Sequence, residues 1–331
     1  MILPLAVARE LRIRDSDAID PTAGCSQQAN PWPAVAGRGS PHLRRRGSPE
    51  SGLGGSRSVC RGGACAKIRS MDLGISGRVA MVAAASQGIG KAAATALAAE
   101  GCRVAICGRT EQSLEAALAD LRALGADVHA TRCDVNSASD IARWFGEVAQ
   151  RWEPPSILVT NTGGPTPGSV GALDDQLWLA GVETTLLCAV RMTRLAVPAM
   201  AEQGWGRIVH VTSIVAMEAN DMLAISTTLR SGMRGLTRLQ AREYGKQGIT
   251  VNAVLPGHTK TDRQDELAER HQAETGEAAA EYFRRLAEAI PVGRLGKPEE
   301  IGAVIAFLCG RQASFVNGVS LLVDGGMSRA V

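Results

Sequence analysis

Aromatic side chains are scarce in this sequence. Phe, Trp and Tyr together make up 3% of the 331 residues, and only two residues are Tyr. A core must therefore be filled by Ala, Val, Leu and Ile, and the hydrophobic fraction of 45% is large enough for a sizeable one. No apolar run approaches the ~20 residues that a membrane-spanning helix needs. We therefore expect no membrane partner and a cytoplasmic protein.

Over most of its length, the chain also lacks a strong excess of positive over negative charge or the reverse. Residues 1–70 contain 11 Lys and Arg against 5 Asp and Glu, and residues 71–331 contain 25 against 28. The mildly acidic second part indicates no nucleic-acid partner. The eight Cys lack the paired spacing or His cluster of a metal site, so no metal is expected. Five of them lie in apolar segments and are expected to be buried thiols of a reducing compartment: Cys102, Cys107, Cys133, Cys188 and Cys309.

The first seventy residues have little that folds. They are rich in Gly, Ser, Pro and Arg, a composition that buries too little apolar surface to offset chain entropy. We expect residues 1–70 to be disordered, or an extension without a folded role that precedes a natural start at Met71. The alternative is that this segment is a transit peptide, but its acidic residues argue against that. No secretory signal is predicted. Residues 71–331 then form a single domain.

From residue 78 onward, short apolar segments alternate with amphipathic helical patterns. Such alternation predicts one α/β domain with a doubly wound, parallel Rossmann-type sheet of about seven strands and helices on both faces. Ligands bind such sheets at the carboxyl ends of the strands, which is where a charged helical insertion at 262–289 is placed to form a substrate lid. The predicted strands are 78–84, 103–107, 127–132, 156–161, 206–212, 249–255 and 319–323, and the other predicted helices are 88–100, 111–124, 137–151, 174–202, 221–246 and 298–310.

The turn between the first strand and the first helix is the most informative segment. It runs Ala84-Ala-Ala-Ser-Gln-Gly-Ile-Gly90, so small residues join a buried strand to a helix N-terminus. Backbone N–H groups at such a turn are free to face an anion, and Gly88 and Gly90 have no Cβ atoms to keep a pyrophosphate or the sheet at a distance. This pattern predicts a nucleotide-binding protein. The alternative is that both glycines serve helix packing alone.

A series of motifs makes the chain from Gly77 to Met327 resemble the short-chain dehydrogenase/reductase family, near its 3-oxoacyl-acyl-carrier-protein reductase branch. The resemblance implies an oxidoreductase with a nicotinamide dinucleotide cofactor and a small-molecule substrate. Ala84 departs from the family pattern, which has Gly there. The motifs are 84–90, Cys133-Asp-Val135, Asn161-Thr-Gly-Gly164, Ile208-Val-His-Val-Thr-Ser213, Ile249-Thr-Val-Asn-Ala-Val-Leu-Pro-Gly257, Gly293-Arg-Leu-Gly-Lys-Pro-Glu-Glu300 and Val323-Asp-Gly-Gly326.

The segment Cys107-Gly-Arg-Thr110, after the second predicted strand, bears on the choice of cofactor. An acidic residue there would accept hydrogen bonds from the ribose of NAD, whereas Arg109 can pair with a 2′-phosphate, aided by Ser86 and Gln87. We therefore expect NADP(H); the alternative is that Arg109 is a solvated turn residue. The resemblance implies further cofactor contacts from Ala84, Gly88, Ile89, Gly90, Asp134, Val135, Asn161, Gly163, Arg230, Pro256, Gly257 and Thr261.

Three of the four catalytic positions that the resemblance implies carry unusual residues. The family uses Ser, Tyr, Lys and Asn, and the matching places here hold Ser213, Ser226, Arg230 and Thr185. A serine hydroxyl is far less acidic than a phenol, and an arginine stays protonated at working pH. Arg230 can still hold ribose hydroxyls and stabilise a developing oxyanion. The pattern is similar to a divergent branch of the family that carries Ser and Arg at these positions.

Other titratable side chains have weaker claims to proton transfer. His210 lies inside a predicted strand, as core histidines do, and Tyr244 lies too far along its helix to reach the site. Tyr282 would matter only if residues 262–289 fold over the site. His258, beside the expected nicotinamide loop, is the remaining candidate.

These substitutions leave three functions open. The first is an atypical NADP(H)-dependent oxidoreductase that acts on a carbonyl, enone or imine, with water, substrate or His258 as the proton source. The second is a non-redox enzyme of the same fold, an isomerase, lyase or dehydratase. The third is an NADP(H)-binding protein without turnover. The helices predicted at 174–202 and 221–246 resemble those that form dimers and tetramers in the family, so we expect a homodimer or homotetramer.

Overall fold

The computed structural model describes residues 72–329. All of them belong to the compact unit Ala66–Val331. The expectations for residues 1–70, a disordered segment or an extension without a folded role, lie outside this described part. Across 72–329, no helix has both the length and the apolar character needed to cross a membrane.

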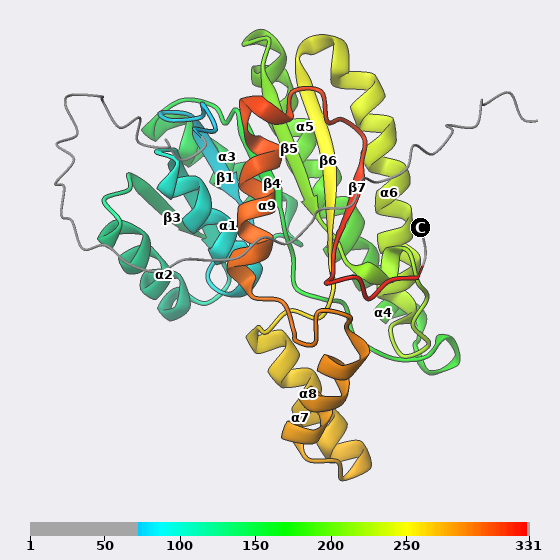
Figure 1. The fold of residues 1–331 in the computed structure, drawn as a ribbon. Helices are drawn as coiled ribbons and strands as arrows, with labels where there is room; N and C mark the ends of the chain where they lie inside the picture. Colours follow the sequence, from blue (N-terminus) through cyan, green and yellow to red (C-terminus); the bar gives the residue numbers. More distant parts are fainter. Residues whose placement is uncertain (1–71, 330–331) are drawn as a thin grey trace, which may run out of the picture. The chain divides into compact units, whose positions relative to one another are not determined.

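Seven parallel strands of the described part form one sheet in the order β3-β2-β1-β4-β5-β6-β7 (Figure 1). The chain winds from β1 outward to β3 and then returns to place β4 on the other side of β1. The order therefore reverses between β1 and β4, the point at which a doubly wound sheet opens a crevice at its strand ends. The predicted Rossmann-type sheet is confirmed. The strands are β1 (Val79–Val82), β2 (Arg103–Gly108), β3 (Val128–Arg132), β4 (Ile157–Thr160), β5 (Gly206–Val211), β6 (Ile249–Pro256) and β7 (Ser320–Val323).

Helices cover both faces of this sheet (Figure 1). The residues of α1, α2 and α9 belong to a core cluster on one face, and those of α3, α5 and α6 belong to a cluster on the other. Small residues bring α1 and α9 close together, since a Cβ on Gly302 would lie 2.6 Å from the carbonyl oxygen of Ala92. The helices are α1 (Gly88–Ala99), α2 (Glu111–Ala123), α3 (Ala138–Arg151), α4 (Asp175–Val182), α5 (Cys188–Glu202), α6 (Ala224–Tyr244), α7 (Asp262–Thr275), α8 (Ala279–Ala289) and α9 (Pro298–Cys309).

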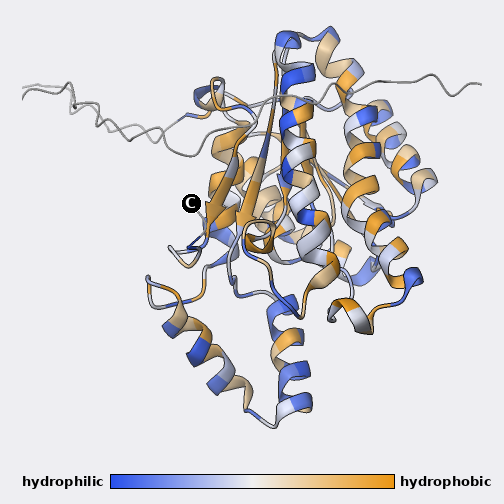
Figure 2. Ribbon diagram, turned by 90° about the vertical axis from the view of Figure 1, so that its right-hand side faces the viewer, coloured by the Kyte–Doolittle hydropathy of each residue, from blue (hydrophilic) through white to orange (hydrophobic). Residues whose placement is uncertain are grey.

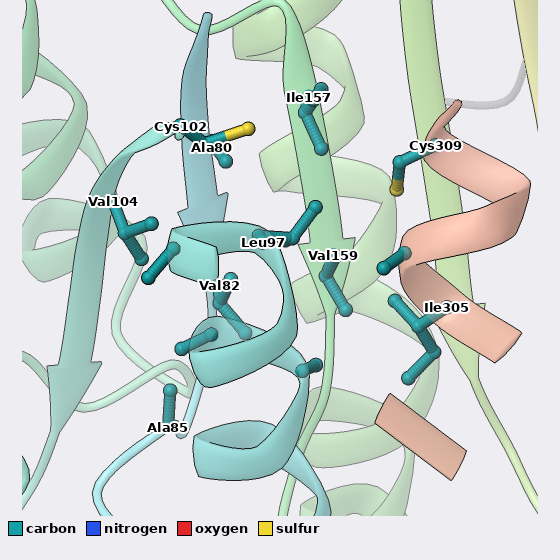
Figure 3. Close-up of a cluster of buried hydrophobic side chains, with 14 of the residues drawn as sticks. Ala80, Val82, Ala85, Leu97, Cys102, Val104, Ile157, Val159, Ile305 and Cys309 are labelled. Atoms are coloured by element: carbon teal, nitrogen blue, oxygen red, sulfur yellow. The ribbon is translucent and has the colours of Figure 1, made fainter. Parts of the chain in front are cut away.

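Strand β1 shows why the core needs few aromatic residues. Ala80 and Val82 face one cluster while Val79 and Met81 face the other, and all four are fully buried. A strand buried on both sides is a continuous apolar run, as parallel sheets require. Figure 3 shows the first cluster, to which α1 contributes Leu97. Truncating this buried leucine to Ala would lower the free energy of unfolding by about 2–5 kcal/mol.

The helix predicted over 174–202 is confirmed, and it contains one irregularity that the sequence did not indicate. Helix α4 passes into a π-helical segment, Glu183–Leu187, and then directly into α5. A π turn contains one residue more than an α-helical turn. The hydrophobic periodicity of the sequence does not reveal the extra residue, because the helical turns on either side keep their apolar faces buried.

The predicted insertion at 262–289 forms a helical pair, α7 and α8, that protrudes past the end of the sheet (Figure 1). The turn between them begins at Gly276, whose φ of +78° is a left-handed conformation that glycine adopts without strain. Hydrophilic residues are spread along both helices (Figure 2), and exposed i,i+4 pairs such as Arg270–Glu274 lie on them. Much of the charge on this pair is therefore exposed to solvent, while Ala268 and Leu286 are buried.

Candidate active site

A cavity of about 580 Å³ runs along the carboxyl ends of the strands and reaches the first turns of α7. It is lined by the turn after β1, the ends of β2, β5 and β6, the segments that follow β3, β4, β5 and β6, part of α4 and the start of α6. Of the site residues predicted from the sequence, Gly90 and Thr185 are outside the lining. The others line it: Ala84, Ser86, Gln87, Gly88, Ile89, Arg109, Asp134, Val135, Asn161, Gly163, Ser213, Ser226, Arg230, Pro256, Gly257 and Thr261.

The turn after β1 is built for a close approach of backbone groups. Gly90 is buried under it, since a Cβ there would lie 2.5 Å from the carbonyl oxygen of Ala84 and 2.8 Å from Nδ2 of Asn161. Asn161 Nδ2 donates a hydrogen bond to the same Ala84 oxygen at 3.1 Å. Gly90 therefore packs the turn against β4 without touching the cavity, which is a structural role that supports the binding surface.

Ala84 has a strained backbone at this turn. Its φ of 46° makes it the one non-glycine residue between 72 and 329 with a positive φ. A left-handed conformation is unfavourable for an L-residue with a Cβ, by about 1–2 kcal/mol. The departure from glycine noted in the sequence therefore leaves the turn geometry in place at an energetic cost.

The N-terminus of α1 opens onto the cavity. Its N-cap residue, Gln87, makes no side-chain capping hydrogen bond, and no acidic residue lies in the first turn. The first N–H groups of a helix have no partner within the helix, and together with the helix dipole they favour a negative group. Gly88, with a φ of +56°, and Thr261 lie together at this mouth.

Two arginines that sequence reasoning missed lie beside Arg109. Arg132 and Arg143 line a hollow that adjoins the main cavity and that Arg109 also lines, together with Asp134 and Asp140. Arg132 Nε donates to the backbone oxygen of Arg109 at 3.2 Å, and Arg143 Nη2 donates to that of Arg132 at 2.7 Å. The sequence did contain a signal for Arg132, namely its position. Arg132 is the last residue of β3, which pairs with β2, and Arg109 directly follows β2.

Arg230 lies deep in the cavity wall, one helical turn after Ser226. Its Nε donates to Ser226 Oγ at 3.1 Å, and its Nη1 donates to the backbone oxygen of Val211 at 3.4 Å. No carboxylate of the described residues forms an ion pair with it. Burial lowers the pKa of Arg230 to about 10, so the guanidinium is charged at neutral pH. This buried cation places a fixed positive charge at that end of the cavity.

The two remaining predicted catalytic residues are placed differently. Ser213 lines the cavity at the end of β5, and its Oγ accepts a hydrogen bond from the Val215 N–H at 3.4 Å. Thr185 is buried in the π-helical segment, where its Oγ1 has no hydrogen-bond partner among the described residues. The adjacent Thr184 lines the cavity instead. The extra residue in the π turn rotates this part of the helix, and so Thr184 rather than Thr185 faces the cavity.

The other proton-transfer candidates lie outside the cavity lining. His258 Nδ1 and Oε1 of Gln264 are 3.3 Å apart, and Gln264 Nε2 donates to the hydroxyl of Tyr282 at 3.1 Å. Of these three residues, Gln264 alone lines the cavity. Burial lowers the pKa of His258, so it is neutral near pH 7. Tyr282 thus belongs to the packing between α7 and α8, and its phenol does not reach the site.

His210 is a satisfied core histidine, as predicted. It is fully buried in β5, with Nδ1 at 2.8 Å from Thr160 Oγ1 and Nε2 at 2.8 Å from Gln240 Oε1. Burial lowers its pKa to about 4. Both ring nitrogens are occupied by neutral partners, so His210 serves the fold and takes no part in the site.

A doubly wound parallel sheet, an anion-accepting turn after its first strand and a cavity across its strand ends define a Rossmann-type nucleotide-binding protein. Comparison with known proteins narrows this class. Residues 83–328 match the family described as enoyl-(acyl carrier protein) reductase. The chain belongs to the short-chain dehydrogenase/reductase family.

Several characterised relatives are reductases. The chain is 32% identical to the 3-oxoacyl-[acyl-carrier-protein] reductase FabG of Pseudomonas aeruginosa over 77% of this chain and 99% of FabG. A solved variant of actinorhodin polyketide ketoreductase with NADPH is 34% identical, with a TM-score of 0.74 over 76% of this chain and 98% of that one. An NADPH-bound short-chain oxidoreductase from Pseudomonas aeruginosa, described as containing an atypical catalytic center, is 29% identical, with a TM-score of 0.70 over 77% and 98%.

Proposed function

We propose that the protein is an atypical NADP(H)-dependent oxidoreductase that acts on a carbonyl, enone or imine group of a small molecule. The observation that carries the proposal is one cavity lined by nearly the whole expected cofactor set, with Arg230 and Ser226 at its inner end. When bound, the nicotinamide cofactor supplies or accepts the hydride. Relatives solved with NADPH support this choice of cofactor.

The residues at the adenosine end fit a cofactor with a 2′-phosphate. Arg109, with Arg132 beside it, offers guanidinium donors, which pair well with phosphate. Arg143 is already paired with Glu147 and supports Arg132 through its carbonyl oxygen. The uncapped N-terminus of α1 would receive the pyrophosphate, because no side chain occupies its N–H groups. Asp134, Val135, Asn161 and Gly163 would border the adenine and its ribose, and Pro256, Gly257 and Thr261 would border the nicotinamide.

The reaction centre would work without a phenol. Ser213 would polarise the substrate oxygen with its hydroxyl, and Arg230 would stabilise the negative charge that develops there while it also holds ribose hydroxyls. Ser226, held by the Nε of Arg230, would complete the hydrogen-bond network. Since neither Ser226 nor a charged arginine gives up a proton easily, the proton would reach the oxygen from water. The similar short-chain oxidoreductase that is described as containing an atypical catalytic center supports a departure from the family's usual site.

A non-redox enzyme or an NADP(H)-binding protein without turnover is the second candidate. The observation that favours it is that no tyrosine of residues 72–329 lines the cavity. A network that stabilises an oxyanion without donating a proton would also suit an isomerase, a lyase or a dehydratase. A screen of ketones, enones and imines, followed at the NADPH absorbance band, separates the candidates. Turnover that Ser213→Ala reduces strongly supports the oxidoreductase, and NADPH binding without any turnover supports the second candidate.

We further propose that the protein forms a homodimer or homotetramer through α4, α5 and α6. Leu179, Leu195 and Leu239 on these helices are 60%, 43% and 64% exposed. Large apolar side chains on neighbouring surface helices are stabilised when a partner covers them.

A further inference from the structure

The substrate end of the cavity contains two guanidinium groups from distant parts of the chain. Arg230 is in the wall on α6, and Arg263 is in the first turn of α7; both line the cavity. Nη1 of Arg263 donates to Glu266 at 3.1 Å. Its Nε and Nη2 lie over Gly164 in the cavity lining, since a Cβ on Gly164 would be 3.4 Å from each. Among the described residues, neither of these two nitrogens has a hydrogen-bond partner.

The two cations are close enough to influence each other. The positive charge of Arg263 adds to burial in lowering the pKa of Arg230. Two like charges that face one cavity are stabilised by an anion between them, and a buried guanidinium without an anion is unfavourable. Ser226 is short, so it leaves the guanidinium of Arg230 accessible from the cavity.

Two carboxylates also line this end of the cavity, and neither engages Nε or Nη2 of Arg263. Glu266 is already paired with Arg263, and Asp262 lines the cavity from an exposed position on the lid helix. Apolar side chains of the cavity lining come from Leu177, Ala180, Leu223 and Leu267, and polar ones from Thr166, Thr184 and Gln264. Such a lining suits a short carbon skeleton with one anionic group.

We propose that the substrate is a small oxo acid whose carboxylate is bound by Nε and Nη2 of Arg263, while its carbonyl oxygen faces Arg230. The inference rests on the proposed oxidoreductase function. In the reducing direction, a hydride from NADPH forms a C–H bond at the carbonyl carbon, the C=O π bond breaks, and a proton from water completes the hydroxyl group. The products are a hydroxy acid and NADP⁺. Arg263 is a specificity-determining residue, because it recognises the carboxylate and takes no part in the hydride transfer.

The test compares two ligands that differ in charge. Full-length protein saturated with NADP⁺, which prevents reduction, is titrated calorimetrically with acetoacetate and with its uncharged methyl ester. Because a charged carboxylate accepts stronger hydrogen bonds than an ester, we expect acetoacetate to bind at least about tenfold more tightly than its methyl ester. Arg263→Gln should reduce this preference to about threefold or less. The matched control Arg270→Gln, on the same helix and outside the cavity lining, should keep it.

The outcomes separate this inference from the proposed function. Saturation with NADP⁺ is measured first, and a protein that binds no dinucleotide contradicts the proposed function itself. If NADP⁺ binds but the ester binds as tightly as the acid, or neither ligand binds at millimolar concentration, the oxo-acid inference is wrong and the cofactor proposal stands. A preference that survives Arg263→Gln unchanged also contradicts the inference.

Discussion

Nε of Arg230 donates a hydrogen bond to Oγ of Ser226 across 3.1 Å, one turn along α6. In the resemblance drawn from the sequence, these residues match the family's Lys and Tyr positions. Their contact forms one network, in which the hydroxyl is an acceptor and the guanidinium is a fixed cation. A network of this kind can stabilise negative charge, but it has no group with a pKa near neutrality to donate a proton.

The first prediction restores the phenol and the amine together. The double variant Ser226→Tyr, Arg230→Lys should reduce a simple ketone with a kcat/KM about tenfold or more above that of the wild type, because a general acid adds at least that much. NADPH oxidation under identical conditions measures the effect. Adding Ser213→Ala to the double variant is the control and should remove the gain. A wild-type protein as fast as the double variant would show that the phenol is not what the site lacks.

The second prediction concerns the cofactor. Arg109→Ala should weaken NADPH binding by about tenfold or more and leave NADH binding unchanged, since a 2′-phosphate would lose a charge-assisted hydrogen bond. Calorimetric titration of both dinucleotides measures the ratio. Arg122→Ala, at the far end of α2, is the matched control. Equal affinities for the two dinucleotides in the wild type would contradict the choice of NADP(H).

The third prediction uses the strained turn. Ala84→Gly should raise the free energy of unfolding by about 1 kcal/mol, because glycine adopts the φ of 46° without a Cβ clash. For a domain of this size, that change raises the melting temperature by about 2–4 °C. Ala85→Gly, a fully buried neighbour with a negative φ, should do the opposite. Calorimetry in which Ala84→Gly melts below the wild type would show that the turn is not strained.

The fourth prediction is a pH effect on stability. Burial lowers the pKa of His210 to about 4, whereas an unfolded histidine titrates near 6.5. As the pH falls through this interval the unfolded chain takes up a proton that the native protein does not, so stability decreases. Between about pH 7 and about pH 5 His210 should account for about 2 kcal/mol of that decrease.

Urea unfolding of the wild type and His210→Gln at both pH values measures this contribution. The variant is expected to be less stable at neutral pH and to lose less stability on acidification, because glutamine does not titrate. All other titrating groups are common to both proteins. An equal decrease in the two would mean that His210 is protonated without cost in the native state.

The fifth prediction addresses assembly. Leu239→Glu should shift the protein towards monomers at micromolar concentration, since it places a charge on the proposed α4–α6 interface. Light scattering measures the mass. Leu124→Glu, an equally exposed leucine at the end of α2, should leave it unchanged. A wild type that is already monomeric would contradict the proposed interface.

Much of the fold was predictable because local pattern determines it. Strands such as β1 and β4 are short apolar runs bounded by turn residues, and the seven predicted strands differ from the observed ones by at most two residues at either end. The π-helical segment at Glu183–Leu187 was not predictable, because one inserted residue leaves the apolar pattern of α4 and α5 intact.

By itself, the sequence determined the alternation of strands and helices, the turn from Ala84 to Gly90 and the spacing that puts Ser226 and Arg230 one turn apart on a helix, because each depends on residues close together along the chain. Tertiary structure alone decided that Arg132 and Arg143 gather beside Arg109, that Tyr282 stays outside the cavity and that Arg263 faces it. Those relationships join side chains from separate elements, and only the packing of the elements brings them together.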